Sequence, residues 1–251
     1  MTIVYTVGAG SRHDDVELKW SLRSIARNGR GVDRVVVVGH IPSFINRSTV
    51  ECIEMDDPTG AKHFNIYAKA KRAVEELKLT EEFLVSSDDH IYTGMTDFSC
   101  YPRLYQGPLK SPAEYPADKK FNAWRTSLFK TLELMKKCGL PTYNTRGHFN
   151  TYFDPKYLEP LDVLMTTPQA PDVGFEHSLL INNLKLYHEP HLASRLVKMS
   201  DCKLDKLSGV AELNSILSTR SVISIGDSVF TCPGVEDEFN RMFPDKCVYE
   251  A

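Results

Sequence analysis

Two adjacent carboxylates, Asp88 and Asp89, follow a short apolar run at residues 83–85. The run predicts a strand, and α/β sheets present ligand-binding groups at the carboxyl ends of their strands. Carboxylate oxygens suit Mg²⁺ or Mn²⁺, and Mg²⁺ is usually held by one or two carboxylates together with a substrate's phosphates. The alternative is a turn in which the aspartates cap backbone amides. We expect a metal site at Asp88 and Asp89, provided that the surrounding elements place them in a sheet.

The chain before this pair alternates between strand and helix patterns. Apolar runs predict strands at 3–7, 33–39, 50–55 and 82–87, and helical spacing predicts helices at 14–28 and 61–77. This alternation predicts an α/β fold with a mostly parallel, twisted sheet flanked by helices. Later segments favour a helical C-terminal portion with one late strand at 222–225; the helices are expected at 122–138, 155–165, 175–187, 210–217 and 235–243.

A proline-rich stretch divides the chain. Residues 95–120 hold four prolines and no clear periodicity, which predicts a functional loop or lid. We therefore expect residues 1–94 to form a nucleotide-sugar-binding half. Residues 121–251 would form the acceptor and catalytic half, completing a single domain.

Composition limits the class of protein. The 251 residues are 42% hydrophobic with a net charge of −3, so nothing draws the whole chain toward nucleic acid or membrane. Between Lys110 and Arg146, eight basic residues face three acidic ones, which suggests a phosphate-bearing ligand or a solvated helix face. The six cysteines lack a CxxC spacing and favour free thiols. With no signal peptide and no apolar run of roughly 20 residues, we expect a cytoplasmic protein without a transmembrane segment.

The first predicted strand runs into Gly8, Gly10 and Ser11. Glycines after a first strand let the backbone approach a nucleotide closely, so these three residues are candidates for binding it. A full dinucleotide fingerprint is absent, because no third glycine opens a helix at the required place.

Three further residues have side chains that could move a proton or bind a metal. His148 lies in a polar loop, and its unperturbed pKa of roughly 6.5 suits a general base. Asp227 follows a predicted strand and a glycine, where it could be a base, a third metal ligand or a turn residue. His90 adjoins the acidic pair, but strand alternation would turn it away from Asp89, so its claim is weaker.

Several segments together resemble the Stealth family of sugar-phosphate transferases. Glu17–Ile25 resembles the family's "ELRYSLRS" segment, and Val35–Gly39 followed by Ile41–Phe44 is similar to its strand-then-"IPSWL" element. Phe64–Asn65, Leu77–Phe83 and Ser87–Asp89 resemble its "FNSNAIE…LSEHFLYLNDD" region. His148 falls near a family histidine, and Ile225–Ser228 with Phe243–Pro244 is similar to its closing segment.

The resemblance implies a GT-A-like glycosyltransferase core in which the acidic pair holds the metal. It also implies that Arg23 contacts the donor phosphate and that Asn65 belongs to the site. The family's arginine-rich stretch has no single counterpart here, which leaves Arg125, Arg146 and Arg195 as alternatives for a second phosphate contact.

Together these observations predict a metal-dependent transferase with a nucleotide-sugar donor and Mg²⁺ or Mn²⁺. It would move a sugar or a sugar-1-phosphate onto an acceptor hydroxyl, with Asp89 in the catalytic centre and His148 or Asp227 as base. The acceptor would be a glycan or modified DNA. The alternatives are a DNA-modifying glycosyltransferase that acts on hydroxylated bases and a non-catalytic sugar-binding module.

Overall fold

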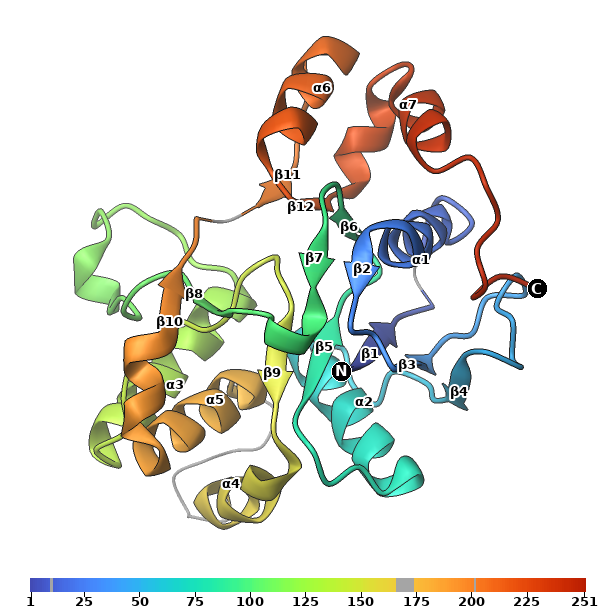
Figure 1. The fold of residues 1–251 in the computed structure, drawn as a ribbon. Coiled ribbons are helices and arrows are strands. Elements are labelled where there is room, and N and C mark those ends of the chain that lie inside the picture. The colour runs from blue at the N-terminus through green and yellow to red at the C-terminus, as the bar shows by residue number, and fades with distance from the viewer. Residues whose placement is uncertain (10, 166–173, 201) are drawn as a thin grey trace.

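The computed structural model describes residues 1–9, 11–165, 174–200 and 202–251 (Figure 1). Within these ranges no helix has both the length and the apolar character needed to cross a membrane. The six cysteines are all free thiols, as the sequence predicts.

The helices lie close to their predicted positions. They are α1 (Val16–Asn28), α2 (Lys62–Leu77), α3 (Ala123–Lys137), α4 (Leu158–Met165), α5 (His177–His188), α6 (Val210–Thr219) and α7 (Val235–Met242). The strands are β1 (Thr2–Val7), β2 (Gly29–Arg30), β3 (Arg34–Gly39), β4 (Glu51–Glu54), β5 (Phe83–Ser86), β6 (His90–Tyr92), β7 (Thr96–Asp97), β8 (Arg103–Tyr105), β9 (Thr151–Phe153), β10 (Leu196–Lys198), β11 (Lys203–Leu204) and β12 (Val222–Ile225).

In the described part of the chain, the central sheet has five strands in the order β4-β3-β1-β5-β9. β1 pairs in parallel with β3 and β5, β3 pairs in parallel with β4, and β9 runs antiparallel to β5. This confirms the predicted mostly parallel α/β sheet. Because the chain moves outward from β1 to β3 and β4 and then returns to β5, the strand order reverses between β1 and β5. Ligands of open α/β sheets bind beyond the carboxyl ends of the strands at such a reversal.

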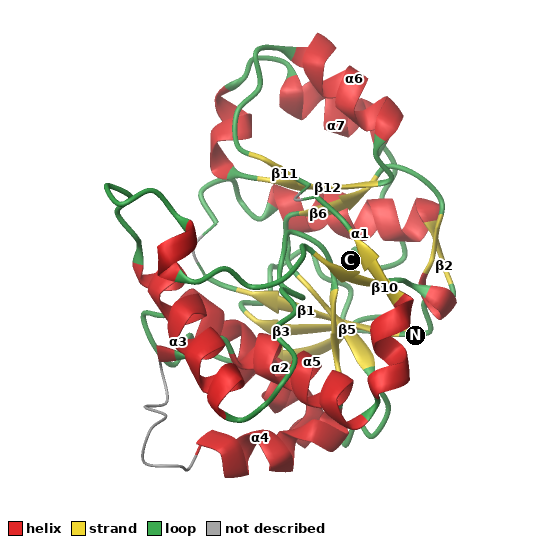
Figure 2. Ribbon diagram, turned by 90° about the vertical axis from the view of Figure 1, so that its left-hand side faces the viewer, coloured by secondary structure: helices red, strands yellow, loops and turns green. Residues whose placement is uncertain are grey.

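Side-chain alternation along the strands covers both faces of this sheet. Ile3, Tyr5 and Val7 of β1 pack in one core cluster with Leu18, Leu22 and Ile25 of α1. Val4 points to the other face, where it joins a cluster that contains Ile66, Tyr67, Ala70 and Ala73 of α2. Figure 2 shows the strands between the layer that contains α1 and the layer that contains α2 and α5. The helices expected at 14–28 and 61–77 therefore cover opposite faces.

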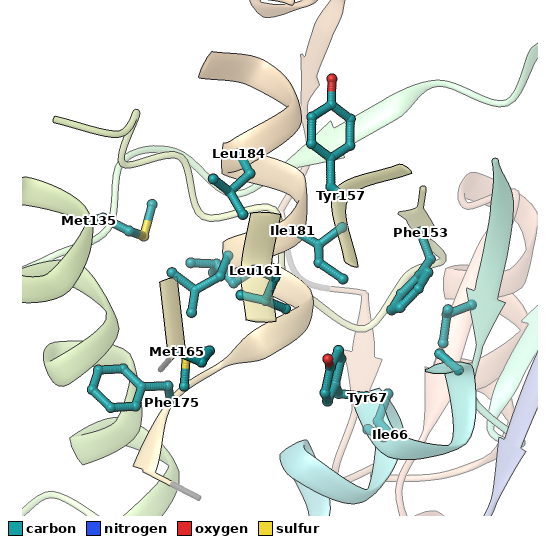
Figure 3. Close-up of a cluster of buried hydrophobic side chains, with 14 of the residues drawn as sticks. Ile66, Tyr67, Met135, Phe153, Tyr157, Leu161, Met165, Phe175, Ile181 and Leu184 are labelled. Atoms are coloured by element: carbon teal, nitrogen blue, oxygen red, sulfur yellow. The ribbon is translucent and has the colours of Figure 1, made fainter. Parts of the chain in front are cut away.

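The C-terminal half extends both layers. α3, α4 and α5 bury their apolar sides with α2 around Leu161, Ile181 and Leu184, and Phe153 of β9 joins them (Figure 3). On the other side, β12 pairs antiparallel with β6, and a third cluster packs Trp20 of α1 against Phe239 of α7. The C-terminal portion is helical as expected, and it also supplies β9 and β12 to sheets that begin in the N-terminal half.

The segment 95–120, expected to be a loop or lid, contains short strands and buried side chains in its first part. β7 pairs with β2, β8 pairs with β10, and Phe98, Tyr101 and Leu104 are buried. Leu109 N also donates a 2.8 Å hydrogen bond to Thr142 O. Strands of two or three residues leave no periodicity in a sequence, and the prolines between them hide the pattern further. A lid motion stays a prediction for residues 110–120 alone.

Candidate functional site

A hollow of about 730 Å³ lies beyond the carboxyl ends of β1 and β5, where the strand order reverses. We call it the first hollow. It is lined by residues from the ends of β1, β5 and β12, from the start of α2 and from the segments beside them: Thr6, Gly8, Ser11, Glu17, Asp57, Thr59, Gly60, Lys62, Asn65, Ile66, Lys69, Ser87, Asp88, Asp89, Lys203, Asp205, Ile225, Gly226, Asp227 and Ser228.

The acidic pair occupies the turn that links β5 to β6. The Ser224 hydroxyl donates a 2.8 Å hydrogen bond to Asp89 Oδ2, and Ile225 N donates to Asp89 O at 3.0 Å. The other carboxylate oxygen, Asp89 Oδ1, is buried without a hydrogen-bond partner. A buried carboxylate oxygen without a donor is costly, so its placement at the edge of a hollow points to a ligand that completes it.

Electrostatics at the turn favour a bound cation. Burial, followed by the neighbouring Asp89 carboxylate, raises the pKa of Asp88 well above its ordinary value, while Lys62 acts in the opposite direction. Burial likewise raises the pKa of Glu17, which lines the same hollow. These carboxylates are short of positive charge, and a divalent ion would supply it.

The two carboxylates fit Mg²⁺ or Mn²⁺ if water and a substrate supply the remaining ligands. Among the described residues, no three His, Cys, Asp or Glu side chains gather closely enough to hold a metal by themselves. Asp227 therefore does not complete a protein-only site with Asp88 and Asp89. Two carboxylates supplemented by water and substrate phosphates remain the arrangement that Mg²⁺ commonly uses.

Asn65 and Lys69 of α2 form another part of the wall of the first hollow. Asn65 Nδ2 donates to Thr59 O at 2.8 Å, and its Oδ1 accepts hydrogen bonds from Thr59 N and Oγ1 at 3.2 and 2.9 Å. Lys69, whose side chain is 3% exposed, donates to Val7 O at 2.7 Å and forms an ion pair with Asp57. Asn65 thus borders the first hollow by fixing its wall.

A glycine at the end of β3 makes room for Lys69. Gly39 has φ +118°, and a Cβ there would lie 2.0 Å from Val7 O and 2.9 Å from Lys69 Nζ. Any other residue would be strained and would collide with both groups. Glycine at position 39 therefore leaves the space in which the buried lysine reaches the end of β1.

A second hollow of about 650 Å³ adjoins the first. It is lined from the starts of α2 and α3, the end of β5 and the loop before β9. Its lining residues are Gly60, Ala61, Lys62, His63, Ile66, Val85, Ser86, Ser87, Asp89, His90, Gln106, Asn122, Ala123, Trp124, Arg146, Gly147, His148, Phe149, Thr151 and Lys203.

The two hollows meet at a shared rim. Six residues line both: Gly60, Lys62, Ile66, Ser87, Asp89 and Lys203. Asp89 therefore borders both spaces, and two exposed lysines border them with it. Two ligands, one in each hollow, would meet at this carboxylate.

The proton-transfer candidates divide between the hollows. His148 lines the second hollow, whereas Asp227 is exposed and lines the first. His90 is buried with Nδ1 3.0 Å from Asn150 Oδ1 and Nε2 3.8 Å from Asp89 Oδ1, so it has not turned away from Asp89 as strand alternation predicts. The reason is that β5 ends at Ser86 and the chain turns before His90. Burial lowers the pKa of His90.

The arginine expected from the family resemblance lies elsewhere. Arg23 Nε and NH2 donate to the two carboxylate oxygens of Glu250 at 2.7 and 2.9 Å, and NH1 donates to Phe243 O at 2.8 Å. It lines neither hollow. Its three donors serve the last residues of the chain, so the structure does not place Arg23 at a donor phosphate.

Arg146, in contrast, lines the second hollow, with Nε 3.4 Å from Oε2 of the buried Glu176. Arg125 lines neither hollow: it donates to Tyr115 OH at 2.6 Å, and its guanidinium lies 5.3 Å from the centre of the Trp124 ring. Arg195 lies in the turn Pro190–Arg195, also outside both.

Two of the three residues after the first strand border the site. Gly8 and Ser11 line the first hollow, and Ser11 Oγ accepts hydrogen bonds from His13 N and Asp15 N at 3.3 and 3.0 Å. Gly10 lies outside the described residues. The nucleotide contact that we expect from Gly8 and Ser11 stays a prediction.

Sequence reasoning missed several lining residues. Lys62 and Lys203 carry no motif, and an isolated lysine usually indicates a solvated surface. Lys69 had a detectable signal, because it shares the buried side of α2 with Ile66, Ala70 and Ala73, where a lysine needs a partner. Trp124 begins an amphipathic helix and looks like a core residue, yet it is 39% exposed.

Comparisons with known proteins add a likeness of fold. The sequence matches no family model, and no curated protein matches it significantly. Among solved structures, the chain is similar to one described as the crystal structure of a glycosyltransferase involved in the glycosylation of the major capsid of PBCV-1. The TM-score is 0.38 and the identity 12%, over 97% of this chain and 98% of that one. A likeness at this level says nothing of a donor, a metal or an acceptor.

Proposed function

We propose that this protein is a transferase that binds a nucleotide-sugar donor in the first hollow, with Mg²⁺ or Mn²⁺ at Asp88 and Asp89. It would move a sugar or a sugar-1-phosphate onto a hydroxyl of an acceptor in the second hollow. One observation carries the proposal: Asp89 lies in the turn that follows β5, at the reversal of the sheet, and borders both hollows. A group-transfer enzyme needs two substrates that meet at one point, and two hollows that share a carboxylate would suit this need.

The charges of the first hollow support an anionic donor that binds with a cation. Six carboxylates line it against three lysines: Glu17, Asp57, Asp88, Asp89, Asp205 and Asp227 against Lys62, Lys69 and Lys203. A diphosphate would be repelled by such a surface unless a cation lay between them. When bound, a divalent ion supplies that charge and stabilises the leaving phosphate.

The lysines at the shared rim suit the same step. Lys62 and Lys203 border both hollows beside Asp89, and Lys203 Nζ lies 3.1 Å from Asp205 Oδ1. In the proposed arrangement their ammonium groups would offset the charge on the leaving phosphate. Lys69 is buried and engaged by Val7 O and Asp57, which makes it a positioning residue for the wall of the hollow. The chain's own cations thus orient the donor from the side of the acceptor.

Placement also ranks the two candidate bases. The acceptor hydroxyl would lie in the second hollow, and His148 lines that hollow while Asp227 does not. In this arrangement a ring nitrogen of His148 takes the proton of the acceptor hydroxyl as the hydroxyl oxygen attacks. Asp227 would then act on the donor side, near the leaving group.

The resemblance to the Stealth family bears on what is transferred. It rests mainly on segments within residues 17–89, with weaker matches at His148, 225–228 and 243–244. Within the first of these segments, Arg23 is bound to Glu250 and lines neither hollow. We therefore keep sugar transfer and sugar-1-phosphate transfer as two forms of one proposal. Incubation with a panel of uridine and cytidine nucleotide sugars distinguishes them by the by-product, because UMP or CMP means that the phosphate moved and UDP means that the sugar alone moved.

Metal dependence is tested on the same samples. We expect EDTA to abolish turnover and Mn²⁺ or Mg²⁺ to restore it. Asp89→Asn should lose Mn²⁺ binding measured in the presence of the nucleotide, while Asp162→Asn, an exposed change on α4, should keep it. Full turnover in chelator would contradict the metal role, and donor binding without any turnover would indicate a sugar-binding module.

A further inference from the structure

The second hollow differs in chemistry from the first. Away from the shared rim, its charged or ionisable lining side chains among the described residues are all basic: His63, His90, Arg146 and His148. At the rim, Asp89 is outnumbered by Lys62 and Lys203. Carboxylates outnumber lysines in the first hollow, whereas in the second Lys62, Lys203 and Arg146 outnumber the single carboxylate of Asp89.

Two long helices also begin at this hollow. Ala61, Lys62 and His63 at the start of α2 line it, and so do Asn122 and Ala123 at the start of α3. α2 has no side-chain cap at Ala61. Because a helix carries partial positive charge at its N-terminus, both helices add to the potential set by the basic side chains.

Trp124 gives the hollow an aromatic wall. Its indole is partly exposed, and Nε1 donates a 3.0 Å hydrogen bond to Glu176 Oε1. With Arg125 lying 5.3 Å from the ring centre, a ligand would pack on the indole surface that Arg125 leaves open. Aromatic side chains provide apolar area for flat ring faces, including the C–H face of a sugar.

One buried carboxylate fixes both recognition groups. Glu176 is fully buried, holds the indole of Trp124 through Oε1 and faces Arg146 through Oε2, which has no hydrogen-bond partner. Its charge balances part of that of Arg146, so the rest of the hollow's positive potential comes from the rim lysines and the helix starts. The indole and the guanidinium are thereby held at a fixed separation, as a specific ligand requires.

We propose that the second hollow selects a glycoside that carries a negative charge, with its ring against Trp124 and its carboxylate or phosphate at Arg146. This rests on the proposed function, since it names the class of acceptor. The location of the basic residues between 110 and 146 argues against a nucleic-acid ligand. Six of them line neither hollow: Lys110, Lys119, Lys120, Lys130, Lys136 and Lys137. A polyanion needs a row of cations along a groove, and here the cations converge on one space.

Trp124 also supplies a direct readout. The chain has two tryptophans, and Trp20 is 0% exposed within the cluster that packs α1 against α7. Fluorescence quenching on ligand addition therefore reports on Trp124. Titrations would use methyl glucoside, methyl glucuronide and methyl glucoside 6-phosphate, three probes that share one ring and differ in charge, without any nucleotide present.

We expect at least one charged probe to bind about tenfold or more tightly than the neutral one, the effect of a charged hydrogen bond. Arg146→Gln should abolish this preference, and Lys130→Gln, an equal loss of charge on α3 outside the hollow, should keep it. Comparing the two charged probes shows whether a carboxylate or a phosphate is preferred. Trp124→Phe should lose the fluorescence change, and calorimetry would then measure how this variant binds the probes.

Equal affinity for charged and neutral probes would overturn the proposal, and so would an unchanged preference in folded Arg146→Gln. Tighter binding of a short oligothymidylate than of every glycoside would overturn it in favour of a nucleic-acid acceptor. Because the titrations need no turnover, a charge preference without sugar transfer would refute only the proposed function. Transfer to neutral and charged acceptors at equal rates would refute only this inference.

Discussion

Replacing Arg23 separates the role implied by the family resemblance from the role seen in the structure. Its side chain is 15% exposed and makes a two-pronged ion pair with Glu250, which is 4% exposed. Arg23→Met would leave that carboxylate buried and would free Phe243 O as well. Breaking a buried pair by removing one partner costs about 3–5 kcal/mol. We expect a loss of stability near the lower end of this range, because Cys247 N still donates a 3.0 Å hydrogen bond to Glu250 Oε1.

Urea unfolding measures this loss as a lower midpoint at unchanged slope. Arg27→Met is the matched control on the same helix, because Arg27 is exposed and donates only to a backbone carbonyl, Met242 O. It should change stability by no more than about 0.5 kcal/mol. The double variant Arg23→Met with Glu250→Gln should lose less than the sum of the single changes, since the two residues act as a pair. Nucleotide affinity should stay the same throughout. A large loss of nucleotide affinity at full stability would refute the structural role and return Arg23 to the donor site.

Three further predictions concern pH, catalysis and motion. Burial tends to raise the pKa of Glu250, but hydrogen bonds from Arg23 and Cys247 outweigh it and leave the pKa below its ordinary value. The contribution of Glu250 to folding stability is therefore complete above about pH 4.3 and is lost as the pH falls through the folded-state pKa. The wild type should lose more stability in acid than Glu250→Gln, and parallel curves of stability against pH would contradict this. His148→Ala should lower turnover by roughly 10²–10⁴-fold with little change in donor affinity, whereas Asp227→Asn should act on the donor side; near-normal turnover in both would exclude the site as drawn. Hydrogen exchange within residues 110–120 should slow when donor binds, and equal exchange in the free and bound states would count against a lid.

The fold was predictable where the sequence pattern reflects burial on one element. The valines of 35–38 are buried on both faces in β3, and α1 and α2 begin and end within a few residues of their predicted bounds. The turn at Asp88 and Asp89 follows from the same logic, because polar residues that end a buried strand must lie at the edge of a sheet. These features depend on neighbours in sequence.

What sequence reasoning missed depends on contacts between distant residues. The partner of Arg23 lies at residue 250, and nothing local to α1 indicates it. Strands such as β7 and β8 are too short for a pattern and exist because β2 and β10 pair with them. The second hollow joins α2, α3 and the loop that contains His148, so its composition appears only once these segments meet.

The order of strand pairing has a consequence for synthesis of the chain on the ribosome. β5 has β1 on one side from early on, but its other edge stays open until residues 151–153 arrive as β9. β6 stays unpaired with β12 for longer, until residues 222–225 have been made. The same strand brings Ser224 to Asp89. An open edge strand invites pairing with other chains, so the nascent protein is exposed to aggregation until β9 and β12 have been made. The acidic turn is fixed only after Ser224 has been made, so a product that stops before β12 cannot form the site.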